Sequence, residues 1–188
     1  MSKISELLDI VDENIFKLKE CEPIISQIAD ICIKAIQSGG KIIFCGNGGS
    51  AADAQHLAAE LMGKFKLDRQ ALPAISLTVN TSVLTAIGND FDYKNIFSRQ
   101  LSGIGKKGDV LIAISTSGNS ENVIKAVQTA NKMGIKTVAF TGKTGGDLAL
   151  ITDASLKVPS DVTNNIQEMH IVCGHIICDL VECYFFKE

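Results

Sequence analysis

The stretch KIIFCGNGGSAADAQHLAAE, residues 41–60, predicts both the fold and a candidate site. Residues 41–45 form a short apolar run, which is typical of a strand in a parallel sheet covered on both faces. The following GNGG at 46–49 predicts a sharp turn where the backbone can approach a ligand, because glycine carries no Cβ. Ser50 is a candidate N-cap for the helix that we expect from residue 51 onward.

A helix that begins directly after such a turn favours an anion, because its first N–H groups are free and carry a partial positive charge. His56 and Glu60 follow on the same helix and, being four residues apart, share one face. The turn lacks the lysine of the GxxxxGK[ST] phosphate loop and the spacing of the GxGxxG dinucleotide motif. Taken alone, the stretch is compatible with a ligand-binding turn and with a tight turn that binds nothing.

Composition limits the class of protein. The 188 residues are 46% hydrophobic and suit a single domain, residues 1–188, with a helical extension at 1–39 and an α/β core at 40–188. The net charge of −3, with interspersed signs, predicts neither a nucleic-acid surface nor a polybasic membrane patch. We expect no membrane-spanning run and no signal peptide. The six cysteines form no CxxC pair and lie mostly in apolar runs, which predicts free thiols and a cytoplasmic location.

The remaining chain alternates strands with helices. Strands are predicted at 41–45, 73–78, 109–114, 135–140 and 153–158, and helices at 3–19, 23–38, 81–87, 93–104, 121–133 and 164–185, beside the helix from residue 51. This order predicts a three-layer α/β sandwich with a five-stranded parallel sheet in flavodoxin-like order, preceded by an N-terminal helical hairpin. The final helix is apolar on most faces, so we expect a homo-oligomer to cover it.

A second turn follows the strand at 109–114. Its sequence STSGNS, residues 115–120, places four hydroxyls around one glycine at a helix N-terminus. Hydroxyls and backbone N–H groups can surround a phosphate without a lysine. The alternative is an ordinary capping turn at Ser120, but four hydroxyls exceed what one cap requires. The pattern therefore favours a phosphate site.

The other two histidines lie in the final helix. His175 occupies a nearly apolar stretch, where a lone histidine is more often a satisfied core residue, and we expect His170 to be structural. Gln167 lies near the start of the same helix, eight residues before His175.

Five motifs together resemble the sugar isomerase (SIS) domain family, and more narrowly its sedoheptulose 7-phosphate isomerases, over essentially the whole chain. They are GNGGSAADAQHLAAE, AIGNDFDYKNIFSR, DVLIAISTSGNSENVIKA, TGKTGG and IQEMHIVCGHIICDLVE. The resemblance implies conversion of D-sedoheptulose 7-phosphate to D-glycero-D-manno-heptose 7-phosphate, the first step toward activated heptoses for lipopolysaccharide or capsule. It also implies a homotetramer with active sites between subunits, and one zinc ion per subunit.

The resemblance also implies a role for each matched residue. Glu60 and His175 match the base and acid, and the metal positions are His56, Glu60, Gln167 and His175. The substrate-binding positions are Asn47, Gly48, Gly49, Ser50, Glu60, Asn89, Asp90, Ser115, Thr116, Ser117, Ser120 and Gln167. Asn164 is one departure, because some relatives are expected to carry aspartate there.

These residue types suit aldose–ketose isomerisation. One carboxylate can move the proton between C1 and C2 of an enediol, histidine can shuttle protons between oxygens, and a metal can polarise the carbonyl. Gln167 and His175 are a difficulty, because eight helical residues rise about 12 Å. Either the helix begins after Gln167 or different subunits contribute the two side chains.

Two rival functions share this fold. One is an oligomeric scaffold that binds a protein partner, which we expect to lack the glutamate at 60 and the histidine at 175. The other is an isomerase or sensor of a different sugar phosphate, such as 3-hexulose 6-phosphate. The presence of Glu60 and His175 favours an enzyme. The leading helical hairpin and the HxxxE pairing of His56 with Glu60 favour the heptose substrate.

Overall fold

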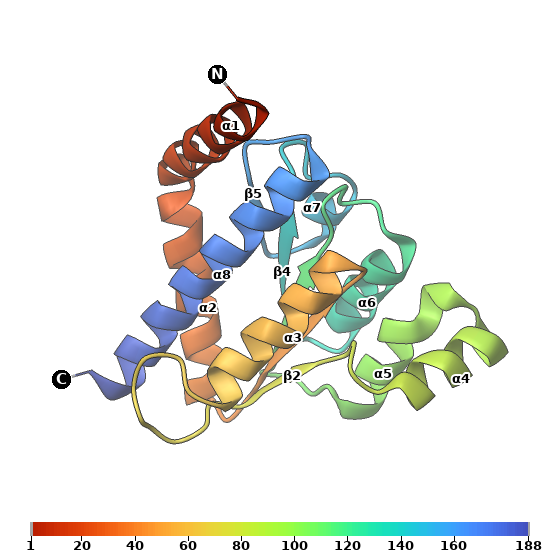
Figure 1. The fold of residues 1–188 in the computed structure, drawn as a ribbon. Coiled ribbons are helices and arrows are strands. Elements are labelled where there is room, and N and C mark those ends of the chain that lie inside the picture. The colour runs from red at the N-terminus through yellow and green to blue at the C-terminus, as the bar shows by residue number, and fades with distance from the viewer. Residues whose placement is uncertain (1, 188) are drawn as a thin grey trace.

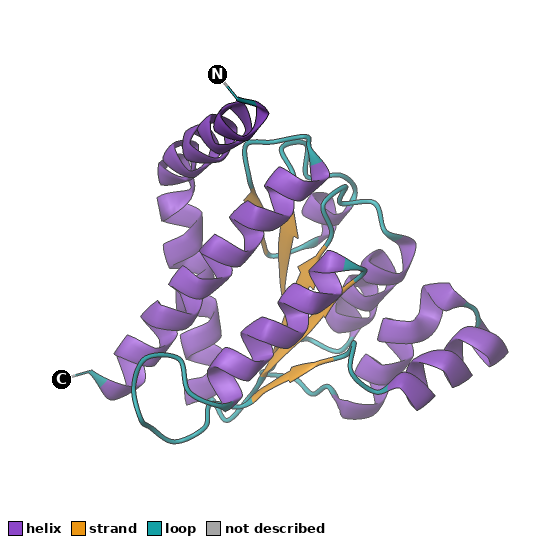
Figure 2. Cartoon of the chain, in the orientation of Figure 1, coloured by secondary structure: helices purple, strands orange, loops and turns teal. Residues whose placement is uncertain are grey.

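Five parallel strands form one sheet in the order β2-β1-β3-β4-β5, which confirms the predicted flavodoxin-like order. This computed structural model of the chain describes residues 2–187 (Figure 1; Figure 2). The strands are β1 (Ile42–Gly46), β2 (Ala74–Ser76), β3 (Val110–Ile114), β4 (Lys136–Thr141) and β5 (Ala154–Lys157). The α-helices are α1 (Lys3–Lys17), α2 (Glu22–Gln37), α3 (Gly49–Met62), α4 (Thr81–Phe91), α5 (Ile96–Ile104), α6 (Glu121–Lys132), α7 (Leu148–Ile151) and α8 (Thr163–Phe186).

Helices cover both faces of the sheet because its central strands are apolar on both sides. Along β1, Ile42 and Phe44 face a core shared with α2, α3 and α8, whereas Ile43 and Cys45 face one shared with α4 to α7. Every residue of β1 and β3 is buried. All six cysteines are free thiols, as predicted, and five of them are buried.

Three local predictions differ from the structure. Ser50 is not the N-cap of α3, because the helix begins two residues earlier than expected, at Gly49, and Gly48 takes the cap position with a φ of +55°, which glycine tolerates. Ser50 is instead buried in the first turn. Helix α4 continues to Phe91, so it includes Asn89 and Asp90, which were expected to follow it. The short helix α7 was not predicted at all.

The terminal helix α8 corrects the expectation that no segment is long and apolar enough to cross a membrane. By length and composition it meets that criterion, with a mean hydropathy of 1.4 over its most apolar window. Here 44% of that window is buried, and α8 packs against α2 and α3. Contact with these two helices explains only part of its low polarity, because the apolar residues Ile176, Leu180 and Tyr184 stay exposed.

Candidate active site

The two turns singled out from sequence lie side by side at the carboxyl edge of the sheet. β1 and β3 are neighbouring strands, and their chains continue into helices on opposite faces, so a crevice opens between them. Asn47 and Asn122 bridge this crevice with two reciprocal amide hydrogen bonds of 2.8 Å. The Tyr93 hydroxyl adds a third contact, donating to Asn47 Oδ1 at 3.1 Å.

Asn122 and Tyr93 were missed by the sequence analysis. Asn122 is only 3% exposed in the first turn of α6, and the available sequence signal was a polar residue directly after the hydroxyl turn. Tyr93 carried no signal, because its contact with Asn47 depends on how the chain returns after α4.

The glycine turn is closed on one side by α8. The amide of Gln167 covers Gly49 so closely that a Cβ there would lie 2.6 Å from Gln167 Nε2. Gln167 therefore stands over the N-terminus of α3, where N–H groups can bind an anion. A larger residue at position 49 would displace this amide.

The hydroxyl turn is organised by its own hydrogen bonds. Ser115 is buried, and its Oγ lies 3.0 Å from the Oγ of Ser120. The Oγ of exposed Ser117 accepts the N–H of Asn119 at 3.1 Å, and the carbonyl of Thr116 accepts the N–H of Gly142 at 2.9 Å. Residues 142–147, which follow β4, thus hydrogen-bond to the hydroxyl turn and hold it in place. All four predicted hydroxyl residues lie in one short segment at the crevice.

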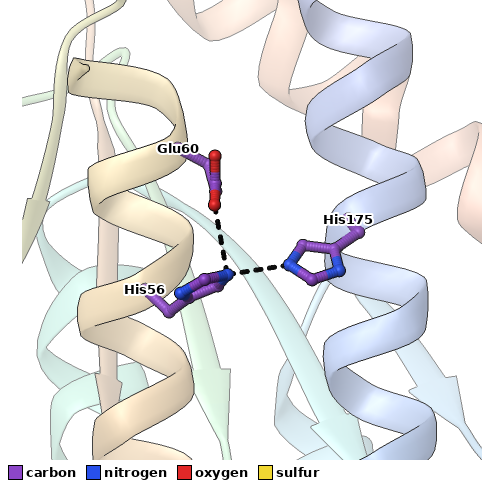
Figure 3. Close-up of side chains that lie close together, drawn as sticks. All are labelled: His56, Glu60 and His175. Carbon is purple, nitrogen blue, oxygen red and sulfur yellow. Dashed lines mark hydrogen bonds and ion pairs between the residues drawn. The ribbon is translucent and has the colours of Figure 1, made fainter. Parts of the chain in front are cut away.

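His56, Glu60 and His175 converge from two helices (Figure 3). His56 Nε2 lies 3.1 Å from Glu60 Oε1 along α3 and 2.8 Å from His175 Nε2 on α8. The helices can approach because α8 carries Gly174 at the contact, where a Cβ would lie 2.7 Å from Leu57 Cδ1. His175 is therefore part of a polar cluster, not a satisfied core residue.

The electrostatics of this cluster favour a cation. When His56 is neutral, its Nε2 carries at most one proton, so it can donate to Glu60 Oε1 or to His175 Nε2 but not to both. Three potential ligand atoms of His56, Glu60 and His175 lie within 4.8 Å of one another. Two imidazole nitrogens and a carboxylate oxygen are a ligand set that zinc accepts at about 2.0–2.2 Å each. The residues fit such an ion with small side-chain adjustments.

Gln167 of the same chain is not part of that cluster. Helix α8 is continuous from Thr163, so the possibility that it begins after Gln167 is excluded. Gln167 and His175 are therefore separated by about 12 Å along one axis, and a second subunit is the remaining way to bring both to one ion.

Asn89 and Asp90 also lie apart from the other predicted residues. Both are exposed in the last turn of α4, and their side chains hydrogen-bond to each other at 2.7 Å. Neither forms a hydrogen bond with another candidate residue within the described chain. Their assignment to the substrate stays a prediction.

Two titratable groups near the site have shifted pKa values. Burial lowers the pKa of His170 to about 4, although its hydrogen bond to the carbonyl of Thr141 at 3.1 Å opposes this shift. His170 is fully buried, in line with its predicted structural role. Burial also raises the pKa of Asp53 to about 6, with nearby His56 acting in the opposite direction. Asp53 was missed, although its spacing from Gly49 and His56 places it on their helix face.

Comparison with known proteins places this geometry in context. The family profile described as SIS domain matches residues 9–142. The chain is similar to the phosphoheptose isomerase of Akkermansia muciniphila, with 53% identity over 95% of this chain and 94% of that protein. The phosphoheptose isomerase of Clostridium acetobutylicum is 58% identical over 87% of this chain and 84% of its own. Among solved structures, that of the phosphoheptose isomerase from Neisseria gonorrhoeae has a TM-score of 0.87 at 42% identity, covering 96% of this chain and 99% of that one.

Proposed function

This chain belongs to the SIS domain family and, within it, to the phosphoheptose isomerases, and we propose that it converts D-sedoheptulose 7-phosphate to D-glycero-D-manno-heptose 7-phosphate. The reaction is an aldose–ketose isomerisation, and it would supply heptose for lipopolysaccharide or capsule from the cytoplasm. The observation that carries the proposal is the convergence of Glu60, His56 and His175 from α3, which begins at the glycine turn, and from α8, whose Gln167 covers that turn.

Glu60 is the base in this proposal. Its side chain is 20% exposed, so it is accessible yet partly shielded from water. A carboxylate in this position removes the proton from C1 of the ketose and returns it to C2, and the intermediate is an enediol. Because one group handles both carbons, the proton stays on one face of the sugar.

His175 moves protons between the sugar oxygens. An imidazole does this near neutral pH, because it gains and loses a proton readily there. Phe65 lies beside its ring, with the ring centroids 5.8 Å apart, and limits the orientations that the imidazole can take. His175 therefore presents a defined face to the substrate.

His56, Glu60 and His175 would hold a zinc ion, which supplies a Lewis acid that polarises the substrate carbonyl. Gln167 would join this set only from a second subunit. Within its own chain, Gln167 covers the glycine turn at Gly49, and this position supports a role for Gln167 in substrate binding.

The substrate phosphate binds at the hydroxyl turn in this proposal. Ser115, Thr116, Ser117 and Ser120 supply hydroxyls, and the N-terminus of α6 supplies a partial positive charge. Asn47 joins this turn to the glycine turn through Asn122, so one ligand can contact both.

A homotetramer completes the proposal. A groove of about 510 Å³ between α1, α2 and α8 is lined largely by apolar side chains, among them Ile15, Val172, Ile176 and Leu180. The outer side of α1 is also apolar and exposed at Ile4, Leu8 and Phe16. Exposed apolar surface of this extent is typical of an interface between subunits.

Incubation of the purified protein with sedoheptulose 7-phosphate in D₂O, followed by NMR, tests the proposal. We expect the aldose product with deuterium at C2, which requires an enediol intermediate. Fructose 6-phosphate serves as a control substrate, because a hexose-specific enzyme would prefer it. An absence of turnover with and without added zinc would contradict the proposal and favour a scaffold that binds a protein partner.

A further inference from the structure

A buried ion pair joins the loop after α3 to helix α8. Arg69 Nε lies 2.9 Å from Glu182 Oε1, and the two side chains are only 2% and 1% exposed. Glu182 lies on α8 seven residues after His175, about two helical turns further along. Burying two charges is costly unless each is fully hydrogen-bonded, so the partners of both groups indicate what the pair holds in place.

Arg69 uses its remaining nitrogens to cap α3. Its Nη2 donates to the carbonyl of Glu60 at 2.9 Å, and its Nη1 donates to the carbonyl of Leu61 at 2.8 Å. The last carbonyls of a helix have no partner within it, and they carry its partial negative charge. The guanidinium of Arg69 supplies a hydrogen-bond donor and a positive charge at the carbonyl of Glu60, the residue that we propose as the base.

Glu182 holds the same loop with its second oxygen. Its Oε2 accepts the backbone N–H groups of Lys66 at 3.0 Å and Leu67 at 3.1 Å. Burial would raise the pKa of Glu182, but the hydrogen bonds from Lys66 and Arg69 hold it below its usual range. The carboxylate is therefore charged in the interior and fully engaged with the loop that ends α3.

The location of the pair relates it to the His56–Glu60–His175 cluster. Helix α3 carries His56 and Glu60, and α8 carries His175 (Figure 3). The Arg69–Glu182 pair ties the C-terminal end of α3 to α8. We propose that Arg69, held by Glu182, is a positioning residue that sets the distance between Glu60 and His175. This inference rests on the proposed function, because it assigns the spacing to metal binding and proton transfer.

The test compares variants that break the pair with one that breaks a neighbouring exposed pair. Arg69→Lys keeps the charge but loses the planar fork, and Glu182→Gln keeps the shape but loses the charge. The double variant Arg69→Met with Glu182→Leu replaces the pair by apolar side chains and keeps the interior packed, so it covers the case in which a single variant does not fold. Lys66→Met is the matched control, because Lys66 Nζ pairs with Asp179 on α8 at 2.8 Å with 57% and 33% exposure.

Each folded variant is assayed for zinc affinity, for the visible spectrum of bound Co²⁺, and for kcat and KM with sedoheptulose 7-phosphate. We expect Arg69→Lys and the double variant to lose about 10- to 100-fold in zinc affinity, with a changed Co²⁺ spectrum and a lower kcat. KM should change little, because the hydroxyl turn that we propose to bind the phosphate follows β3 and belongs to neither α3 nor α8. Lys66→Met should match the wild type in all four measurements.

The possible failures are distinguishable. A folded variant of the pair with wild-type zinc affinity, Co²⁺ spectrum and kcat would overturn the inference, since the pair would then serve stability alone. A wild-type protein that neither binds zinc nor isomerises the sugar would instead remove the proposed function.

Discussion

Nε2 of His56 lies 2.8 Å from Nε2 of His175, although the two residues are 119 positions apart in the chain (Figure 3). Glu60 Oε1 lies 3.1 Å from the same nitrogen of His56. Each side chain offers a lone pair or a proton to the others, so the group can bind a cation and can also exchange protons. In the proposed mechanism, proton transfer and metal binding use the same three residues.

Glu60→Gln should reduce kcat by about 10²- to 10⁴-fold, because the amide cannot accept the proton from C1. The melting temperature should stay near that of the wild type, since Arg69 contacts the backbone of residue 60 and not its side chain. Stopped assays of the aldose product and thermal unfolding check both statements. A wild-type rate in this variant would show that another group is the base.

Ser117→Ala should raise KM by tenfold or more and weaken inhibition by inorganic phosphate, because a hydrogen bond to a charged group is lost. The kcat value should change little, because the reacting carbons lie away from the phosphate. Ser102→Ala is the matched control, an exposed serine on α5 whose hydroxyl donates to the carbonyl of Ser98. Equal KM values in the two variants would argue against phosphate binding at this turn.

His170 should make the fold sensitive to acid. Its pKa is about 4 in the folded protein and 6.5 without burial, so the unfolded state gains a proton first as the pH falls. Its contribution to the free energy of unfolding should therefore fall by about 2 kcal/mol between pH 7 and pH 5. Urea unfolding of wild type and His170→Gln at both pH values measures this, and an equal loss in the two proteins would contradict it.

Asp53 should lower the stability of the fold at high pH, whereas His170 lowers it at low pH. Its pKa is about 6 in the folded protein against an ordinary value of 3.8, so its burial costs stability once the pH is high enough to ionise it. In metal-free protein, Asp53→Asn should raise the melting temperature at pH 8 and leave it nearly unchanged at pH 4. A stabilisation of the same size at both pH values would have to come from packing instead of charge.

Leu180→Asp should reduce the mass of the assembly, because it places a charge in the apolar groove beside α1. Leu150→Asp is the control, since Leu150 is 82% exposed on α7 and does not line that groove. Light scattering after size exclusion gives the mass of each variant. If Leu180→Asp keeps the wild-type mass, α8 is not part of the interface between subunits.

The sheet could be predicted from sequence because its signals are local. Buried apolar runs such as that of β3 specify strands by composition, and the glycines and hydroxyls that follow β1 and β3 mark where the two candidate ligand-binding turns begin. Because parallel strands end at one edge, the two turns were expected to be neighbours, and the Asn47–Asn122 pair shows that they are. Helix ends were less accurate, as at Gly48 and Phe91, because capping depends on neighbours that a single sequence does not reveal.

The sequence by itself determined the strands, the two turns and the pairing of His56 with Glu60, because each depends on residues close together in the chain. Only the tertiary structure decided that His175 meets His56, that Gln167 covers Gly49 instead, and that Arg69 reaches Glu182. The physical reason is that these contacts depend on how closely α8 packs against α3. That distance is set by Gly174 and Leu57 on different helices, and no local pattern encodes it.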